Sequence, residues 1–416
     1  MKDKILKFIY SVLKRYAMKV LRRYKPFVVA ITGSVGKTTT KEFTYKLFCD
    51  AFGEENVRAN AGNLNAEIGI PLTILGYRNT PGKFELIWLL LSAYFRTFIS
   101  DYPKYLILEM GVEHPGDIDY FCSIVKPNVG VVTAATPAHV VNFKNLNEMQ
   151  SEKIKLLKYV KDAGIVNGDD KFIQASKVSA ITYSIVDEKA NCCAENIKLT
   201  VTGTNYVLIY NNKHFQVENK LLGKQMVYSQ MAAYLAAVSS GVDPKAAALS
   251  LNEIIPYPGR MNLVEGVNNV IIIDDTYNAN PASSEAAIET LASIKHSGRK
   301  VLIHGNMNEQ GSEEQQVHLQ LGEKTSGKVD FAVFVGQNAE VMQKGFGDRV
   351  KSIVFKNRSE LIKNIEKIIQ PDDLVLVKAS QNNNYFEEVT KLLMKNKDQS
   401  RSVLVRQSQS WLRKKR

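Results

Sequence analysis

The stretch FVVAITGSVGKTTT, residues 27–40, constrains this chain more than any other part of its sequence. An apolar run typical of a buried strand leads into a glycine-containing turn that ends in Lys-Thr, and helix-forming residues follow. In phosphate-binding loops with this order, backbone N–H groups and a helix N-terminus face a phosphate, the lysine neutralises the outer phosphates, and the hydroxyl reaches Mg²⁺. The spacing is the shorter G-x-x-G-K-T, because Ile31 stands five residues before Gly36. The stretch predicts a nucleoside triphosphate as ligand; the alternative is a glycine turn with an exposed lysine.

Length and composition limit the class of protein. The chain has 416 residues, which predicts two or three domains, and 45% apolar with 23% charged residues is typical of a globular protein. Its four cysteines form no C-x-x-C pair, which favours a reducing, cytoplasmic setting. The formal charge of +12 indicates an anionic partner, which is nucleotide, nucleic acid or an acidic membrane surface.

Residues 2–25 place apolar side chains at helical spacing among many lysines and arginines, which predicts a basic amphipathic helix. Charges interrupt the apolar stretch and no cleavage site follows, so it is not a secretory signal. The helix lies either on an anionic membrane surface or against the next domain. A second apolar stretch, residues 86–95, is shorter than the about 20 residues of a bilayer span. It is either a buried helix or a second part of a membrane-facing surface with residues 96–99.

Two further strands place polar residues near the loop. The strand predicted at residues 105–108 ends at Glu109, and ligands of open α/β sheets gather at the carboxyl ends of strands. Glu109 is therefore expected to hold a metal ion near the phosphates. The strand at residues 129–133 leads to His139, and a helical stretch carries Lys153. Taken alone, a structural histidine and a solvated lysine are the commoner interpretations of these two.

The second half of the chain alternates strands and helices. Apolar runs at residues 270–273, 300–303, 331–335 and 374–377 predict strands, with a helix at 284–294. Such alternation is typical of a parallel, doubly wound sheet. Residues 178–222 alternate apolar and polar side chains and predict a small β insertion, and residues 255–259 predict a hinge.

Seven motifs occur in order along residues 26–395: GSVGKTTTKE, GNLNAEIGIP, EMGVEHPGDI, AHVVNF, SEK, PGRM and DDTYNANP. Together they resemble the Mur ligase family, and the last is most similar to the branch that adds D-alanyl-D-alanine to a UDP-muramoyl-tripeptide. The resemblance implies an α/β protein with a central P-loop ATPase domain, whose sheet is mostly parallel, and a C-terminal Rossmann-like domain. The expected divisions are residues 1–25 (the basic helix), 26–256 (the ATP-binding domain with its β insertion) and 257–416 (the C-terminal domain with a basic tail).

The resemblance also implies roles for individual residues. Lys37 and the loop would bind the ATP phosphates, two Mg²⁺ ions would be held by Thr38, Glu109, His139 and Lys153, and Lys153 would be carbamylated, which makes a cation into a carboxylate-like ligand. Catalysis would depend on Lys37, His139 and Lys153. The residues expected to contact nucleotide are Gly33, Ser34, Val35, Gly36, Lys37, Thr38, Thr39, Arg260, Asp275, Tyr277, Asn278 and Asn280.

The implied reaction is ATP-driven amide formation in bacterial peptidoglycan precursor synthesis, in the cytoplasm or at the inner face of the membrane. A substrate carboxylate takes the γ-phosphoryl group, and an amine then displaces phosphate. Domain closure is expected to bring the muramoyl-peptide acceptor and the dipeptide amine together. No nucleic acid partner is expected.

Some positions depart from the family pattern. The N-terminal domain that grips the UDP-sugar is expected to be absent, because about 25 residues before the loop strand are too few for a domain. Gln225, Met226 and Ser229 stand where the family usually has His-Asn and a later Asn, and Asn306 and Gln310 alter the stretch that selects the amine. Two alternatives therefore stay open: another carboxylate–amine ligase with a lipid-linked or amino-acid acceptor, and a nucleotide-binding membrane scaffold without ligase activity.

Overall fold

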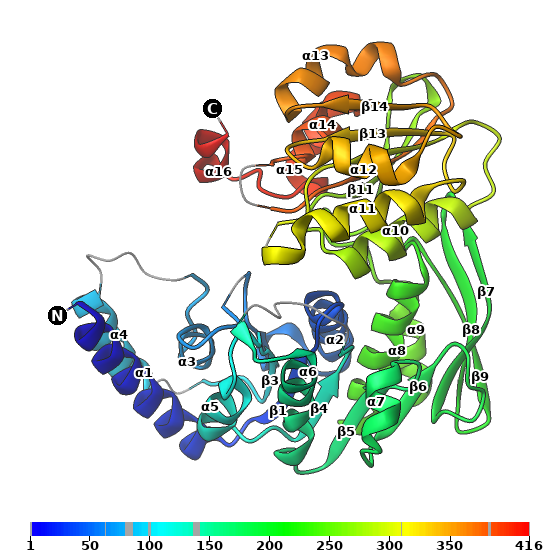
Figure 1. Cartoon of the computed structure of the whole chain (residues 1–416). Helices are drawn as coiled ribbons and strands as arrows, with labels where there is room; N and C mark the ends of the chain where they lie inside the picture. The colour runs from blue at the N-terminus through cyan, green and yellow to red at the C-terminus, as the bar shows by residue number, and fades with distance from the viewer. Residues whose placement is uncertain are drawn as a thin grey trace. The chain divides into compact units, whose positions relative to one another are not determined.

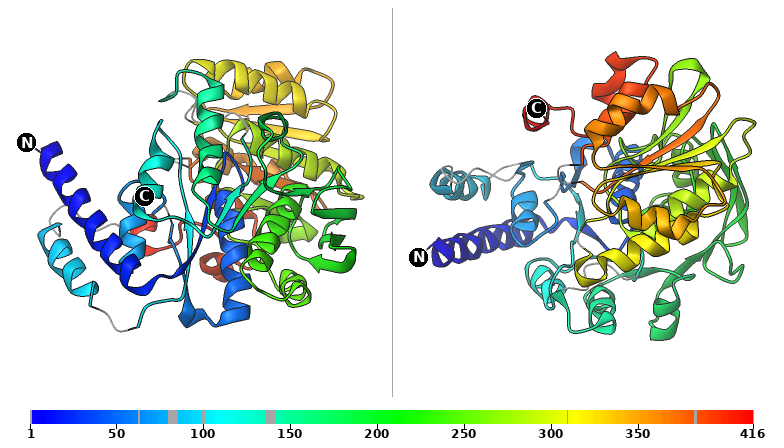
Figure 2. Two further views of the ribbon diagram at one scale, coloured as in Figure 1. Left: turned by 90° about the horizontal axis from the view of Figure 1, so that it is seen from below. Right: turned by 45° about the horizontal axis from the view of Figure 1, so that its top comes forward.

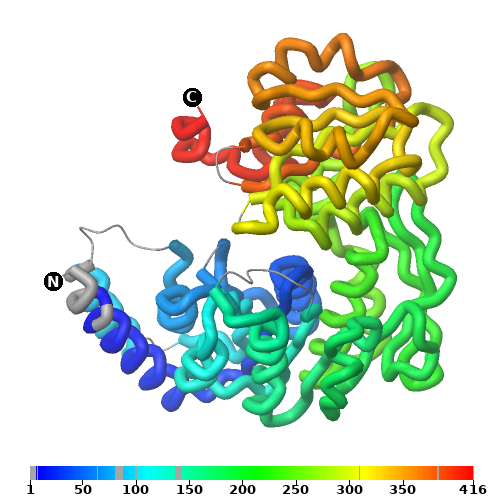
Figure 3. The backbone as a smooth tube through the Cα atoms, in the orientation of Figure 1, coloured from blue at the N-terminus to red at the C-terminus, as the bar shows by residue number. Residues whose placement is uncertain are grey.

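The computed structural model describes residues 2–62, 64–79, 86–98, 101–135, 142–308, 310–381 and 384–415; the others are grey in Figure 3. His139 lies outside the described residues. The described chain forms two compact units. Unit 1 consists of Met1–Glu195, Val207–Val217 and Val227–Glu253, and unit 2 of Asn196–Tyr206, Glu218–Met226 and Ile254–Arg416.

The larger sheet has the strand order β2-β3-β1-β4-β5-β6-β7-β8-β9; β1 to β6 lie in unit 1, and the residues of β7 to β9 are divided between the two units. The pairs from β2 to β7 are all parallel. The predicted small β insertion is strands β7 to β9, at one end of this sheet (Figure 1). The strands are β1 (Phe27–Thr32), β2 (Val57–Ala59), β3 (Tyr105–Glu109), β4 (Val129–Val132), β5 (Ala163–Asn167), β6 (Ile181–Ser184), β7 (Cys192–Thr200), β8 (Gly203–Tyr210) and β9 (Lys213–Asn219).

Helices cover the sheet of unit 1. They are α1 (Lys2–Tyr24), α2 (Lys37–Phe52), α3 (Gly69–Ile74), α4 (Leu86–Arg96), α5 (Asp117–Ile124), α6 (Leu146–Ile154), α7 (Lys171–Ser176), α8 (Lys224–Ser239) and α9 (Pro244–Asn252). The parallel strands are apolar on both faces, as the burial of all four residues of β4 illustrates, because a parallel sheet between helices has no solvated side.

The predicted N-terminal helix is α1, and its apolar stripe is part of the core of unit 1. Ile9, Leu13, Ala17 and Val20 are at most 5% exposed and belong to the same cluster as β1, β3 and α5. Helix α1 contacts α3, α4 and α5. Of the two placements predicted for residues 2–25, the structure therefore shows the helix packed on its own domain.

Unit 2 contains a sheet of order β10-β11-β15-β12-β13-β14, parallel throughout except for the pair β10 and β11. This confirms the predicted α/β fold class for the second half of the chain. Its strands are β10 (Asn262–Glu265), β11 (Ile271–Asp275), β12 (Lys300–His304), β13 (Phe331–Val335), β14 (Ser352–Phe355) and β15 (Leu374–Lys378).

The helices of unit 2 are α10 (Pro281–Ser293), α11 (Glu314–Thr325), α12 (Ala339–Phe346), α13 (Arg358–Ile368), α14 (Glu387–Leu393), α15 (Ser400–Val403) and α16 (Gln409–Lys414). The basic tail is anchored: Lys415 pairs with Glu387 and Glu388, and the Trp411 ring lies 6.4 Å from that of Tyr385. Across the described chain, none of the helices combines the length and the apolar content that crossing a bilayer requires.

Candidate nucleotide and metal site

The loop after β1 is shaped by two glycines and held by the end of β4. Gly33 and Gly36 have φ angles of 144° and 83°, in the region that residues with a side chain rarely adopt. A Cβ on Gly33 would lie 2.1 Å from Thr133 Oγ1. Thr133 Oγ1 donates to the Val35 carbonyl at 2.6 Å, and Ser34 N donates to the Ala134 carbonyl at 2.8 Å. The loop is thus fixed at the carboxyl edge of the sheet, directly before α2.

Lys37 is the first residue of α2 and folds back over the loop. Its Nζ donates to the Gly33 carbonyl at 2.7 Å, with the Ser34 carbonyl at 3.5 Å. An ammonium in this position lies at the N-terminus of a helix, an arrangement that is typical of phosphate-binding loops. The Thr39 side chain is buried at 7% exposure, and its contact with nucleotide stays a prediction.

Glu109, at the end of β3, lies beside the loop as the sequence predicts. Its Oε1 accepts hydrogen bonds from Thr38 Oγ1 at 3.1 Å and from Asn65 Nδ2 at 3.0 Å. Asn60 forms two hydrogen bonds with the Glu109 backbone: its Oδ1 accepts one from the Glu109 N–H, and its Nδ2 donates one to the Glu109 carbonyl. The hydroxyl and the carboxylate predicted as metal ligands are therefore in direct contact.

The other carboxylate oxygen, Glu109 Oε2, is buried and has no hydrogen-bond partner among the described residues. A buried, unpaired oxygen is costly, and a cation would satisfy it. Oxygen ligands suit Mg²⁺, which is usually held by one or two carboxylates, phosphates and water. No cluster of three or more His, Cys, Asp or Glu that could hold a metal occurs in the part of the chain described. The residues present therefore fit an ion held jointly by Glu109, Thr38 and a nucleotide.

Lys153, on α6, is 1% exposed, although the sequence alone favoured a solvated lysine. Its Nζ contacts Met149 Sδ and lies 6.0 Å from the centre of the Phe143 ring. Burial, with a smaller contribution from the positive charge of Lys37, lowers the pKa of Lys153 to about 7, against a raising effect of Glu152. A large fraction of this amine is therefore neutral and nucleophilic at neutral pH.

In unit 2, residues predicted to contact nucleotide surround the end of β11. The Asp275 carboxylate pairs with Lys378 Nζ, which also donates to the Asn278 carbonyl at 3.1 Å. The Arg260 guanidinium lies 4.1 Å from the centre of the Tyr277 ring. Burial lowers the pKa of Lys378, and Asp275 opposes that shift.

Asn280 caps α10, because its side chain accepts from Ser283 N, and Asn278 Oδ1 accepts from Gln381 N. Asp275, Asn278 and Asn280 thus have structural partners within unit 2. Arg260 Nε is buried without a hydrogen bond among the described residues, so it retains a donor for a ligand. The contacts of these residues with nucleotide stay predictions.

Two family models match the chain. One described as "Mur ligase middle domain" matches residues 31–237, and one described as "Mur ligase, glutamate ligase domain" matches residues 259–381. The chain belongs to the Mur ligase family. The resemblance to the Mur ligase family that the sequence motifs indicated is thereby confirmed for both the central and the C-terminal part of the chain.

Curated relatives extend the match along most of this Mur ligase. The UDP-N-acetylmuramoyl-tripeptide–D-alanyl-D-alanine ligase of Escherichia coli K12 is 29% identical over 382 residues, covering 89% of this chain and 77% of the relative. The protein of the same name from Bacillus subtilis 168 is 26% identical over 393 residues, covering 92% and 79%.

Solved structures show the same architecture. A crystal structure of MurF from Acinetobacter baumannii has a TM-score of 0.74 at 25% identity and covers 92% of this chain and 80% of that one. MurF ligase from Thermotoga maritima, in complex with ADP, also has a TM-score of 0.74, at 24% identity, and covers 94% and 84%. The latter likeness shows the fold alone.

The structure of this Mur ligase brings together Lys37, Thr38 and Glu109, and the charge of Lys37 acts on Lys153. Sequence reasoning gave no role to Asn60, Asn65, Thr133 and Lys378. Asn65 stands in a quoted motif, GNLNAEIGIP, so an amide in a turn near a strand end was an available signal. Thr133 and Lys378 stand at strand ends of the same kind as Glu109, which also offered a signal.

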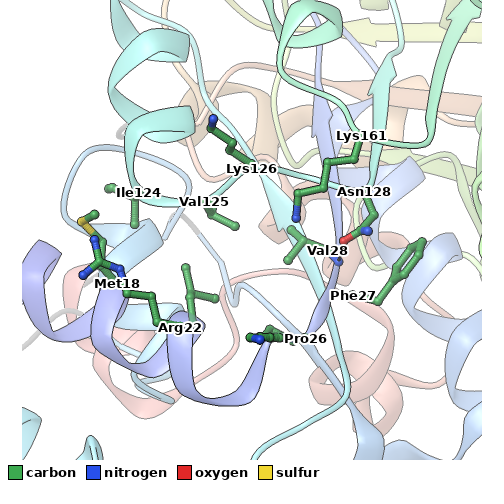
Figure 4. Close-up of a pocket in the computed structure, with 12 residues that line it drawn as sticks. Met18, Arg22, Pro26, Phe27, Val28, Ile124, Val125, Lys126, Asn128 and Lys161 are labelled. Carbon is green, nitrogen blue, oxygen red and sulfur yellow. Dashed lines mark hydrogen bonds between the residues drawn. The ribbon is translucent and has the colours of Figure 1, made fainter.

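A separate pocket of about 360 Å³ lies at the opposite, amino edge of the sheet of unit 1 (Figure 4). Arg22, Lys25, Lys126 and Lys161 are among its lining residues. Arg22 and Lys25 stand at the carboxyl end of α1 and Lys126 just beyond that of α5, where cations complement the helix dipoles.

Proposed function

We propose that this protein is an ATP-dependent ligase that adds D-alanyl-D-alanine to a muramoyl-tripeptide in peptidoglycan precursor synthesis. The observation that carries the proposal is the contact between Thr38 and Glu109 beside the loop, with Glu109 Oε2 buried and unpaired among the described residues. Relatives that carry this activity in their names match about nine-tenths of the chain, and both halves match Mur ligase models.

The chemistry we propose has two steps. A substrate carboxylate oxygen attacks the γ-phosphorus of ATP, the bond to ADP breaks, and an acyl phosphate forms. The nitrogen of the amine then attacks the acyl carbon, phosphate leaves with the C–O bond electrons, and the nitrogen loses a proton. The loop amides and Lys37 hold the phosphates and offset the charge on their oxygens, while Thr38 and Glu109 orient the site.

We further propose that Mg²⁺ is held by Thr38 and Glu109, with a second ion near His139 and Lys153. Bound Mg²⁺ would neutralise phosphate oxygens. The burial of Lys153 supports its predicted carbamylation, because the reaction with CO₂ requires the neutral amine. Among the described residues its contacts are with Met149 and Phe143, and the carboxylate of Glu152, which raises its pKa, pairs with Lys155.

The test is product formation from ATP, UDP-muramoyl-tripeptide and D-alanyl-D-alanine, followed by ADP release and mass spectrometry. We expect a product whose mass equals both substrates less one water, formed only when both are present. Lys37→Ala should abolish it, and the matched surface change Lys363→Ala should not. Hydrolysis of ATP that is indifferent to every amine and every carboxylate offered would contradict the ligase proposal.

The domain limits at residues 26–256 and 257–416 are part of the proposal, and the gap between the two family matches, residues 238–258, supports them. We also propose a cytoplasmic protein that touches the inner face of the membrane peripherally. The exposed cations of α1 support this location. They also favour a second candidate acceptor, a lipid-linked muramoyl-peptide, to be run in parallel in the same assay.

A further inference from the structure

Helix α4 presents a row of large apolar side chains to solvent. Trp88, Leu91, Phe95 and Phe98 are 72%, 48%, 64% and 51% exposed, and they follow one another at steps of three, four and three residues along the helix and its last turn. Leu89 and Ala93, on the other side, are buried in the core of unit 1. We call the four exposed residues the α4 stripe. Soluble proteins expose such residues singly, so a helical row of them indicates a binding surface.

Helix α1 supports α4 along one flank. The rings of Tyr16 and Tyr94 lie 6.0 Å apart, Lys19 Nζ lies 4.5 Å from the centre of the Phe98 ring, and Arg23 donates to the Thr97 carbonyl. The two helices run side by side and project from the rest of unit 1 (Figure 2, right). The stripe is therefore carried on a supported, accessible edge.

Helix α1 carries exposed cations next to α4. Lys19 and Arg23 contact Phe98 and Thr97, and Arg15 and Arg22 are exposed on the same helix. Helix α4 contains no acidic residue, and α1 contains one, Asp3. A second copy of this chain docked stripe to stripe would bring two such rows of cations together, which is unfavourable. An anionic bilayer complements both features, because it takes aromatic side chains at its interface and attracts lysine and arginine.

We propose that the α4 stripe inserts into the interfacial layer of an anionic lipid leaflet while the exposed cations of α1 face the headgroups. The inference rests on the membrane location proposed above and names its surface. It assigns insertion to α4, because the apolar stripe of α1 is already buried in the protein core. Helix α4 lies in the interface plane, since its 11 residues cannot span a bilayer.

The first test measures sedimentation of the full chain with vesicles containing about one-third anionic lipid. We expect Trp88→Ser with Phe95→Ser to lower the partition coefficient at least tenfold. The matched control, Val186→Ser with Leu249→Ser, removes other exposed apolar side chains of unit 1 and should leave it unchanged. Arg15→Gln with Arg22→Gln should lower it several-fold, and Lys363→Gln with Lys367→Gln in α13 should not.

The second test uses fluorescence. The chain has two tryptophans, so Trp411→Phe leaves Trp88 as the single reporter. Its emission should shift to the blue with anionic vesicles and stay unchanged with purely zwitterionic ones. Unaltered emission with anionic vesicles, or equal partition of the stripe variant and the wild type, overturns the inference. The inference is also overturned if the wild type forms a dimer and binds no vesicles, and the stripe variant is a monomer.

Ligase turnover on soluble substrates, measured in the same variants, separates the two proposals. A stripe variant that keeps turnover and loses vesicle binding supports the inference and leaves the ligase proposal intact. Vesicle binding through the stripe in a protein that never forms product contradicts the ligase proposal alone.

Discussion

Replacing Asp275 by Asn tests whether this carboxylate serves the fold of unit 2 or a ligand. Asp275 and Lys378 are 6% and 1% exposed, and their side chains pair within the unit. Removing the negative charge leaves the Lys378 ammonium buried without its counter-charge. Breaking a buried pair from one side costs about 3–5 kcal/mol. For a folding unit of about 150–250 residues, that loss lowers the melting temperature by about 10 °C.

The assay is calorimetric unfolding of Asp275→Asn, Lys378→Met and the double variant. The double variant should be more stable than the sum of the single losses predicts, because it leaves no unpaired charge. The KM for ATP at 25 °C should change little in Asp275→Asn. Losses below about 1 kcal/mol, together with a tenfold rise in that KM, would refute the structural role and favour the nucleotide contact.

Three further changes test the loop and its surroundings. Thr38→Ala removes the hydroxyl that donates a hydrogen bond to Glu109. This change should lower kcat/KM about 10- to 100-fold and raise the Mg²⁺ concentration needed for activity, with an unchanged unfolding midpoint. A wild-type Mg²⁺ titration would contradict the assigned contact. Gly33→Ala should abolish ATP binding in calorimetric titration, because its Cβ would collide with Thr133 Oγ1; wild-type affinity would show that the loop moves freely. Because the pKa of Lys153 is lowered to about 7, the unfolded chain binds a proton above pH 7 that the folded chain lacks. The unfolding free energy of the wild type should therefore rise by about 1.4 kcal/mol per pH unit from pH 7 to 10 relative to that of Lys153→Met, and the two curves should run parallel below pH 7. Parallel curves over the whole range would mean that Lys153 titrates as an ordinary lysine.

The sequence alone predicted what depends on local pattern. The loop, the basic helix α1 and the strand that delivers Glu109 each follow from a short motif or a single period of apolar residues. Four strands of the second half, β11, β12, β13 and β15, and the helix α10 were predicted for the same reason. Short edge strands such as β10 and β14 were not, because four residues give little periodic signal and depend on a neighbour for pairing.

Contacts between distant residues lay beyond such reasoning. Lys378 ends an apolar run and pairs with a carboxylate about one hundred positions earlier, which no local pattern encodes. The burial of Lys153 depends equally on what packs over α6, including Phe143. The face of α4 that meets solvent became clear only once α1 was seen to occupy the other side.

The placement of α1 has a practical consequence for anyone who shortens this chain. The match to the middle-domain family model begins at residue 31, yet the buried apolar core of unit 1 begins at Ile9. A protein trimmed to start at residue 31 would lose the four buried side chains of α1, of which the larger ones contribute about 1.5–3 kcal/mol each, together with Val28 and Ala30 of β1. The core around α5 would then be exposed to water. Helix α1 looks like a dispensable leader in the sequence, yet its apolar side chains are part of the core of the ATP-binding half.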